Sequence, residues 1–177
     1  YGDGGAVFTN NEEYEKKIKM LRVHGQTKRY HHKYIGIGGR LDTLQAAILL
    51  AKLPNFREEL NNRQKVADQY TNKLSKTLQT PVIRQNRTSA WAQYTLRVKN
   101  RDSMQMKLRD KGIPTSVFYP VPLNLQECFK YLNSKRDDFP ISDEASKEVL
   151  SIPMNPFLNN AQIEYITSNM NGLTKSK

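Results

Sequence analysis

A basic segment interrupted by glycines carries the side chains most suited to chemistry in this sequence. Residues 29–40 contain two arginines, two tyrosines, two histidines and a lysine, and an apolar stretch follows at 41–53. Guanidinium groups bind carboxylates and phosphates through paired hydrogen bonds, and the N-terminus of a helix attracts anions. The segment therefore predicts an anion-binding loop that leads into a helix. Arg40 would lie just before the N-terminus of that helix. A purely structural ion pair between Arg40 and Asp42 is the alternative.

Three further groups could do chemistry, and each also has a structural interpretation. The three histidines lack a Cys or acidic partner at metal-ligand spacing, so we expect no metal site. Cys128 has no neighbouring nucleophile signature and is interpreted as a small core hydrophobe. Tyr119 precedes Pro120-Val121-Pro122, a stiff extended segment. Its ring could simply pack, or it could present a hydroxyl to a cleft.

The composition limits the fold and the cellular location. The chain has 177 residues, of which 37% are hydrophobic, enough for one domain or for one domain plus a piece of another. No apolar run approaches the roughly 18 residues of a membrane span, so we expect no membrane partner. No secretory leader is recognised. The single cysteine excludes an internal disulfide framework and fits a reducing compartment, so we expect a cytoplasmic protein.

A net charge of +11 requires an explanation. Basic chains often bind nucleic acid, but here Lys and Arg are spread along the sequence and are not interleaved with aromatic residues in the usual way. We therefore expect no nucleic-acid partner. The simplest interpretation of the positive charge is a solvated lysine-rich surface. A more specific interpretation is that the charge attracts a phosphorylated small molecule.

Local patterns predict a mixture of helices and short strands. A first helix, capped by Thr9 or Asn10, is expected to end at Gly25, and later helices should begin near Asp42, Phe56, Asp102, Pro140 and Asn160. The fifth of these six helices should run through Val149. Short strands are expected at 6–9, 81–83, 92–98 and 114–119. Helices packed on a small sheet indicate an α+β layer from Leu53 onward.

Pro54 marks the clearest change of character along the chain. Residues 41–53 are apolar on nearly every side of a helix, which is typical of an element buried inside a larger body. The helix after Pro54 is amphipathic and more self-contained. We therefore predict two parts, residues 1–53 and 54–177. An apolar helix left exposed at 41–53 should drive dimerisation or aggregation.

Several motifs, taken in order, resemble one known family. The match spans essentially the whole chain, and its closest similarity is to the branch that aminates a 3-keto UDP-sugar acid in O-antigen (lipopolysaccharide) synthesis. The family is the DegT/DnrJ/StrS sugar aminotransferases, which depend on pyridoxal phosphate (PLP). The motifs are Tyr1-Gly2-Asp3-Gly4-Gly5-Ala6-Val7-Phe8-Thr9-Asn10, His24-Gly25-Gln26, Arg29-Tyr30-His31-His32, Arg40-Leu41-Asp42-Thr43-Leu44-Gln45-Ala46-Ala47, Tyr119-Pro120-Val121-Pro122-Leu123-Asn124 and Ser151-Ile152-Pro153-Met154.

The resemblance implies an α/β fold of the aspartate-aminotransferase type (fold type I). Residues 1–53 would be the C-terminal remnant of the large PLP-binding domain, and residues 54–177 would be the small α+β C-terminal domain. Family members are dimers with the active site at the subunit interface. Arg40 resembles the arginine that reaches an acidic group of the substrate, and Tyr119 the tyrosine that lines the sugar-nucleotide pocket. His24, Arg29 and Tyr30 fall in the loop that approaches the substrate.

Three departures from the family pattern bear on activity. The resemblance places the Schiff-base lysine a few residues upstream of Tyr1, so no catalytic residue is expected within this chain. Gly38 stands where the family usually has an asparagine that reaches the neighbouring subunit's cofactor phosphate. Phe118 replaces a histidine often found before the Tyr-Pro pair.

Two interpretations of function follow from the resemblance. In the first, the chain is the C-terminal part of an enzyme that moves an amino group from glutamate to a keto-sugar nucleotide. It would be inactive, and would bind no PLP, until a missing N-terminal half is supplied. In the second, the chain is a catalytically inactive remnant or interaction module of the same fold, which the changes at Gly38 and Phe118 favour.

Overall fold

The computed structural model describes residues 3–175, so Tyr1 and Gly2 of the first motif lie outside the described part. The chain divides into two compact units, one up to Phe56 and one from Arg57 onward. Each unit is described by itself. That these units belong to a large and a small domain, with a boundary at Pro54, stays a prediction.

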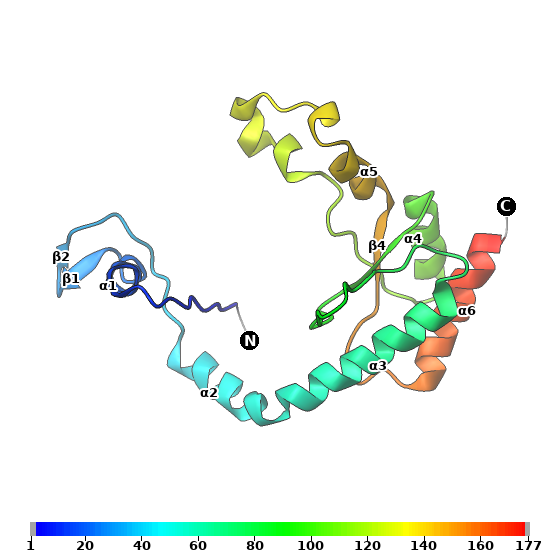
Figure 1. The fold of residues 1–177 in the computed structure, drawn as a ribbon, viewed down its shortest axis with the longest axis horizontal. Coiled ribbons are helices and arrows are strands. Elements are labelled where there is room, and N and C mark those ends of the chain that lie inside the picture. Colours follow the sequence, from blue (N-terminus) through cyan, green and yellow to red (C-terminus); the bar gives the residue numbers. More distant parts are fainter. Residues whose placement is uncertain (1–2, 176–177) are drawn as a thin grey trace. The chain divides into compact units, whose positions relative to one another are not determined.

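The first unit is a helix, a small hairpin and a second helix (Figure 1). Helix α1 (Glu12–Leu21) is followed by the antiparallel strands β1 (Gln26–Lys28) and β2 (His31–His32). Helix α2 (Thr43–Lys52) then continues into a short 3-10 turn, η1 (Leu53–Asn55), which contains Pro54.

The second unit packs three helices against a two-stranded antiparallel sheet (Figure 1). Its helices are α3 (Phe56–Leu74), α4 (Arg101–Asp110) and α6 (Asn160–Lys175), and its strands are β3 (Tyr94–Arg97) and β4 (Val149–Ile152). Strand pairing runs from Tyr94 opposite Ile152 to Arg97 opposite Val149. An arm leaves the sheet between α4 and β4, made of η2 (Leu123–Leu125), η3 (Glu127–Leu132), η4 (Arg136–Asp138) and α5 (Pro140–Glu148).

All the buried hydrophobic side chains of the described residues lie in the second unit, between Val66 and Met170. Val66, Ala67, Tyr70 and Leu74 form one face of α3, as its amphipathic pattern predicts. Alternate residues of β3 and the predicted face of α6 complete the core. Burial of a large apolar side chain contributes about 1.5–3 kcal/mol, so this cluster is what stabilises the second unit.

Several predicted strands are wrong. Residues 6–9 and 81–83 are not strands, because no neighbouring segment pairs with them within residues 3–175; Phe8 and Val82 are exposed. The strand predicted at 114–119 is reduced to one bridge, between Ser116 and Ser151. Conversely, the helix expected to run through Val149 stops at Glu148, and the following four residues form β4, which pairs with β3.

The helix caps also differ from the predicted ones. Asn11 caps α1, with its side-chain oxygen accepting from the backbone N–H groups of Glu13 and Tyr14. Asn100, in a left-handed conformation, precedes α4, and Asp102 instead pairs with Arg101. Asp42 does precede α2 but makes no capping hydrogen bond.

Cys128 is exposed, so its interpretation as a core residue is wrong. It lies in η3, in the arm that projects beyond the core. No helix within residues 3–175 is both long enough and apolar enough to span a membrane.

Helix α2 is the most apolar exposed element of the first unit. None of its residues is buried, and Leu44 is 77% and Leu50 69% exposed. Leu53 and Phe56, just beyond it, are exposed as well. Exposed apolar surface of this kind marks a contact with another body or a site of association.

We therefore expect the 177-residue chain to self-associate through α2. Analytical ultracentrifugation should show species heavier than the 20.5 kDa chain. Replacing Leu44 and Leu50 together by Gln removes two apolar contacts and should raise the dissociation constant about tenfold or more.

Leu123→Gln is the matched control, because Leu123 is equally exposed but lies in the arm of the second unit. It should leave the association unchanged. A clean monomer for the unaltered chain would contradict the prediction.

Candidate functional site

Two glycines fix the loop that carries most of the predicted site residues. Gly25 has a φ of +69°, and a Cβ there would lie 1.8 Å from the Tyr34 carbonyl oxygen. A Cβ at Gly36 would lie 2.3 Å from the Gly25 nitrogen. Neither contact is possible for another residue, so the glycines let residues 34–38 pass directly against the turn that follows α1.

Backbone hydrogen bonds hold this close approach together. The Gly25 oxygen accepts from the Lys33 nitrogen at 2.8 Å, and the Ile37 nitrogen donates to the Leu21 oxygen at 2.9 Å. The His24 nitrogen in turn donates to the Ile37 oxygen at 3.0 Å. The backbone of the loop is thus ordered while its polar side chains remain exposed.

His24, His32 and Gly38 come together in this loop. The Nδ1 of His32 donates to the His24 carbonyl oxygen at 2.9 Å. A Cβ at Gly38 would meet Cε1 of the His24 ring at 3.2 Å and Nε2 at 3.4 Å. The space beside Gly38 is therefore bordered by the His24 imidazole, which a larger residue would crowd.

Arg29 and Tyr30 form a second pair at the tip of the hairpin. The Arg29 guanidinium lies 5.0 Å from the centre of the Tyr30 ring and donates to its hydroxyl at 3.2 Å. Tyr30 has a φ of +65°, unusual for a residue with a side chain. The Arg29 guanidinium and the Tyr30 phenol are thus exposed side by side.

The loop is strongly and uniformly basic. Residues 16–41 contain eight Lys or Arg residues and no Asp or Glu. Lys16 and Lys19 are neutralised by the helix residues Glu12 and Glu15, and Lys19 keeps the pKa of Glu15 below its ordinary value through a hydrogen bond and its charge. The other cations have no carboxylate partner in residues 3–175, so this surface attracts anions.

Arg40 is exposed at the end of this basic loop, three residues before the first residue of α2. Within the described part of the chain its guanidinium forms no ion pair, so the alternative of a structural pair with Asp42 does not hold. An unpaired guanidinium is free to accept a carboxylate or a phosphate from outside.

The second unit brings two of the sequence motifs together. Ser116 and Ser151 exchange backbone hydrogen bonds of 3.0 and 2.8 Å, which places the segment before Tyr119 beside the end of β4. Phe118 and Ser151 line a cavity of about 230 Å³. Tyr119 is 69% exposed and meets the Phe118 ring edge-on at 5.5 Å.

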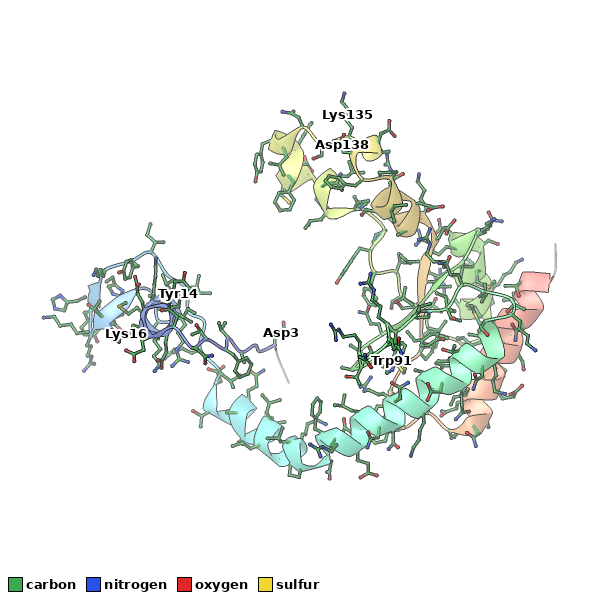
Figure 2. All side chains as sticks on the ribbon, viewed as in Figure 1. Asp3, Tyr14, Lys16, Trp91, Lys135 and Asp138 are labelled. Atoms are coloured by element: carbon green, nitrogen blue, oxygen red, sulfur yellow. The ribbon has the colours of Figure 1, made fainter. Side chains whose placement is uncertain are left out.

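Hydrogen bonds from side chains of helix α3 hold the segment that follows β4 and the segment that precedes β3. The Tyr70 hydroxyl donates to the Pro153 oxygen at 2.8 Å, and Arg63 donates to the backbone oxygens of Trp91 and Met154. Figure 2 shows Trp91 beside α3, where its ring nitrogen donates to Gln64 at 2.7 Å. The buried core thereby positions the segment 151–154.

The arm that follows Tyr119 is held by charges. Figure 2 shows Lys135 and Asp138 in this arm, where the backbone N–H of Lys135 donates to the Asp138 carboxylate at 2.7 Å. Asp143 accepts from Lys147 at 2.5 Å and from Arg136. The Lys147 ammonium, followed by the Arg136 guanidinium, keeps the pKa of Asp143 below its ordinary value despite its burial.

The predicted site residues thus fall into two groups, with His24, Arg29, Tyr30, Gly38 and Arg40 in the first unit and Tyr119 in the second. Sequence reasoning gave no role to His32, Ser116 or Ser151. The two serines lie in or beside recognised motifs, but only the strand pairing reveals their contact. No cluster of His, Cys, Asp or Glu within residues 3–175 could hold a metal ion.

Comparison with known proteins gives consistent results. The profile of the DegT/DnrJ/EryC1/StrS aminotransferase family matches residues 1–171. The chain is 47% identical to UDP-2-acetamido-2-deoxy-3-oxo-D-glucuronate aminotransferase of Pseudomonas aeruginosa, over 94% of this chain and 46% of that protein. It is 40% identical to a "pleiotropic regulatory protein" of Geobacillus stearothermophilus, with 94% and 46% covered. The chain spans about half the length of the curated relatives it matches.

Solved structures of similar fold come from the same class of aminotransferases. A DegT/DnrJ/EryC1/StrS aminotransferase from Brucella abortus matches with a TM-score of 0.84 at 32% identity, covering 96% of this chain and 46% of that one. The PLP form of a protein described as a sugar aminotransferase from Streptococcus pneumoniae shares the fold, with a TM-score of 0.82, 20% identity, and 94% and 45% covered. These likenesses confirm the predicted α/β fold of the aspartate-aminotransferase type.

Tyr70→Phe should lower the free energy of unfolding by about 1 kcal/mol, because it removes the hydrogen bond that holds the Pro153 oxygen. Chemical denaturation followed by the fluorescence of Trp91, the single tryptophan, measures the loss. Tyr165→Phe is the matched control, since its hydroxyl also donates to a backbone oxygen but its side chain is exposed. Equal losses in the two variants would show that Tyr70 has no special anchoring role.

The arm should loosen in acid. Because the folded pKa of Asp143 is lowered, its contribution is present above the unfolded pKa of about 4 and is lost as pH falls through the folded value. The protection factors for amide hydrogen exchange in α5, which compare the observed rate with the intrinsic rate at the same pH, should therefore fall below about pH 4. Asp143→Asn should remove this pH dependence, whereas Asp137→Asn, in the same arm, should retain it. An unchanged exchange profile in Asp143→Asn would refute the assignment.

Proposed function

This chain belongs to the DegT/DnrJ/EryC1/StrS aminotransferase family, and we propose that it forms the C-terminal part of a PLP-dependent aminotransferase. The reaction would move an amino group from glutamate to a keto-sugar nucleotide. The observation that carries the proposal is the 47% identity to an aminotransferase of a UDP-linked 3-oxo-glucuronate sugar, over 94% of the chain. Surface-polysaccharide synthesis, as for O-antigen, is the pathway class that we propose.

The charge of the first unit supports this substrate class. A UDP-sugar acid carries a diphosphate and a carboxylate, all negatively charged at neutral pH. The basic loop offers cations without carboxylate partners, among them Arg29 and Arg40. We propose that Arg40 binds an acidic group of the sugar nucleotide and that His24, Arg29 and Tyr30 line its path. Tyr119, on its stiff segment, would contact the nucleotide sugar from the second unit.

In this proposal the described residues would supply the substrate-facing part of the site, and by themselves they do not fit the cofactor. Gly38 has no side chain to reach a cofactor phosphate, and a Cβ at that position would lie 3.2 Å from the His24 ring. The lysine that would carry PLP is expected upstream of Tyr1. When bound, PLP supplies an electron sink for the amino transfer. We propose that the chain alone binds no PLP.

The working enzyme would be a cytoplasmic homodimer, or a complex of this chain with an N-terminal half. Exposed apolar α2 supports an assembly of this kind, because an isolated helix with no buried residue lacks a covering partner.

A non-catalytic interaction module of the same fold is the second candidate. Gly38 and Phe118 favour it, since both lack the polar side chain that the family pattern leads one to expect. A relative at 40% identity is described as a regulatory protein. Direct measurement of turnover decides between the two candidates.

The test uses the longest natural polypeptide that contains these residues, supplied with PLP, glutamate and the UDP-linked 3-oxo-glucuronate sugar. Release of 2-oxoglutarate should be detected. Arg40→Ala should raise KM for the sugar nucleotide about 10- to 100-fold while changing kcat less, as expected when a charge-assisted contact is lost. Arg109→Ala, an exposed arginine on α4, is the control.

Absence of turnover, with an intact lysine segment upstream, would overturn the proposal in favour of the interaction module. Turnover with an unchanged KM in Arg40→Ala would preserve the activity but remove Arg40 from the substrate site.

A further inference from the structure

A cavity lies in the second unit at the opposite end of the sheet from Ser116 and Ser151. It has a volume of about 450 Å³ and opens where Arg97 of β3 pairs with Val149 of β4. Its walls come from the segment after α3, the end of β3, α4 and α6. Small-molecule sites fall between about 300 and 1,000 Å³. The cavity is large enough for a ligand of a dozen or so atoms.

The floor of the cavity is apolar. Leu78, Met104 and Leu173 line it, from three different segments. Met104 belongs to the hydrophobic core, and the two leucines are partly buried against that core. A floor of this kind favours the binding of a hydrocarbon group and contributes little binding free energy to a fully hydrated ion.

The rim of the cavity is cationic. Arg97 lies there, but its guanidinium is already bound to Glu148 at 2.8 Å and Glu144 at 3.1 Å. These two carboxylates raise the pKa of Arg97, so its guanidinium stays ionised. Lys99 and Lys107 also line the cavity. Neither forms an ion pair within the described part of the chain.

The charge balance of the lining is therefore positive. Glu148 is the only carboxylate among the described residues that line the cavity, and Arg97 neutralises it. The two lysines and the Ser103 hydroxyl remain available as donors toward an anion.

We propose that this cavity binds a small amphipathic anion, with its hydrocarbon part on Leu78, Met104 and Leu173 and its carboxylate or phosphate between Lys99 and Lys107. The ligand would join α4 and α6 to the segment that follows α3. Binding to the folded unit alone stabilises that unit by mass action. The site does not depend on amino transfer, so it can be tested whether or not the chain is part of an active enzyme.

The test titrates octanoate into the whole 177-residue chain, with inorganic phosphate and octan-1-ol as partial ligands. Isothermal titration should give tighter binding for octanoate than for either partial ligand, because only octanoate uses both the floor and the rim. Methyl NMR signals of Leu78, Met104 and Leu173 should shift, and those of Leu50 on the exposed α2 should not.

The variant Lys99→Gln with Lys107→Gln removes both rim charges and should weaken octanoate binding about tenfold or more. Lys130→Gln, an exposed lysine in the arm, is the matched control and should leave it unchanged. Octanoate shifts confined to Leu50, equal binding of octanol and octanoate, or undiminished binding in the double variant would each overturn the proposal. Thermal unfolding of each variant without ligand confirms that it is folded.

Discussion

The uneven distribution of buried apolar surface is the constraint on which the rest of the structure depends. Every buried hydrophobic side chain within residues 3–175 lies in the second unit. In the first unit, up to Phe56, only Gly25 is buried. Backbone hydrogen bonds and the close approach of Gly25 and Gly36 keep that unit ordered, but they bury almost no hydrocarbon. Because hydrophobic burial is the main favourable term in folding, the first unit gains less of this term than the second unit, and its exposed apolar side chains are the surface that an added contact would stabilise most.

The same distribution explains which parts of the fold could be predicted from the sequence. The helical period of Val66, Ala67 and Tyr70 and the alternation through β3 both report burial within this chain, and both predictions are confirmed. The strand at 6–9 was predicted from composition alone and has no neighbour to pair with. Strand β4 was missed because Val149–Ile152 continues an apolar helix face without a turn signal, and only pairing with β3 decides its conformation.

Some features of the candidate site could likewise be predicted from the sequence, and others could not. The basic character of residues 16–41 follows from the sequence, because no carboxylate interrupts it, and the unpaired state of Arg40 is consistent with that pattern. The contact between the His24 ring and Gly38 could not be predicted, since it depends on a left-handed His24 and on residues 34–38 folding back over the turn after α1. Likewise, the link from Tyr70 to Pro153 joins residues 83 positions apart and depends on tertiary packing.

The contact at Gly38 also bears on the two candidate functions. Gly38 does not have a positive φ, so its backbone does not require glycine, and its small size matters only because the His24 ring lies 3.2 Å from where a Cβ would be. Glycine at this position therefore leaves the His24 imidazole more room than a larger residue would. Backbone hydrogen bonds order this loop, and the His32 ring holds the His24 carbonyl, so the anion-binding role proposed for the loop is compatible with glycine at position 38.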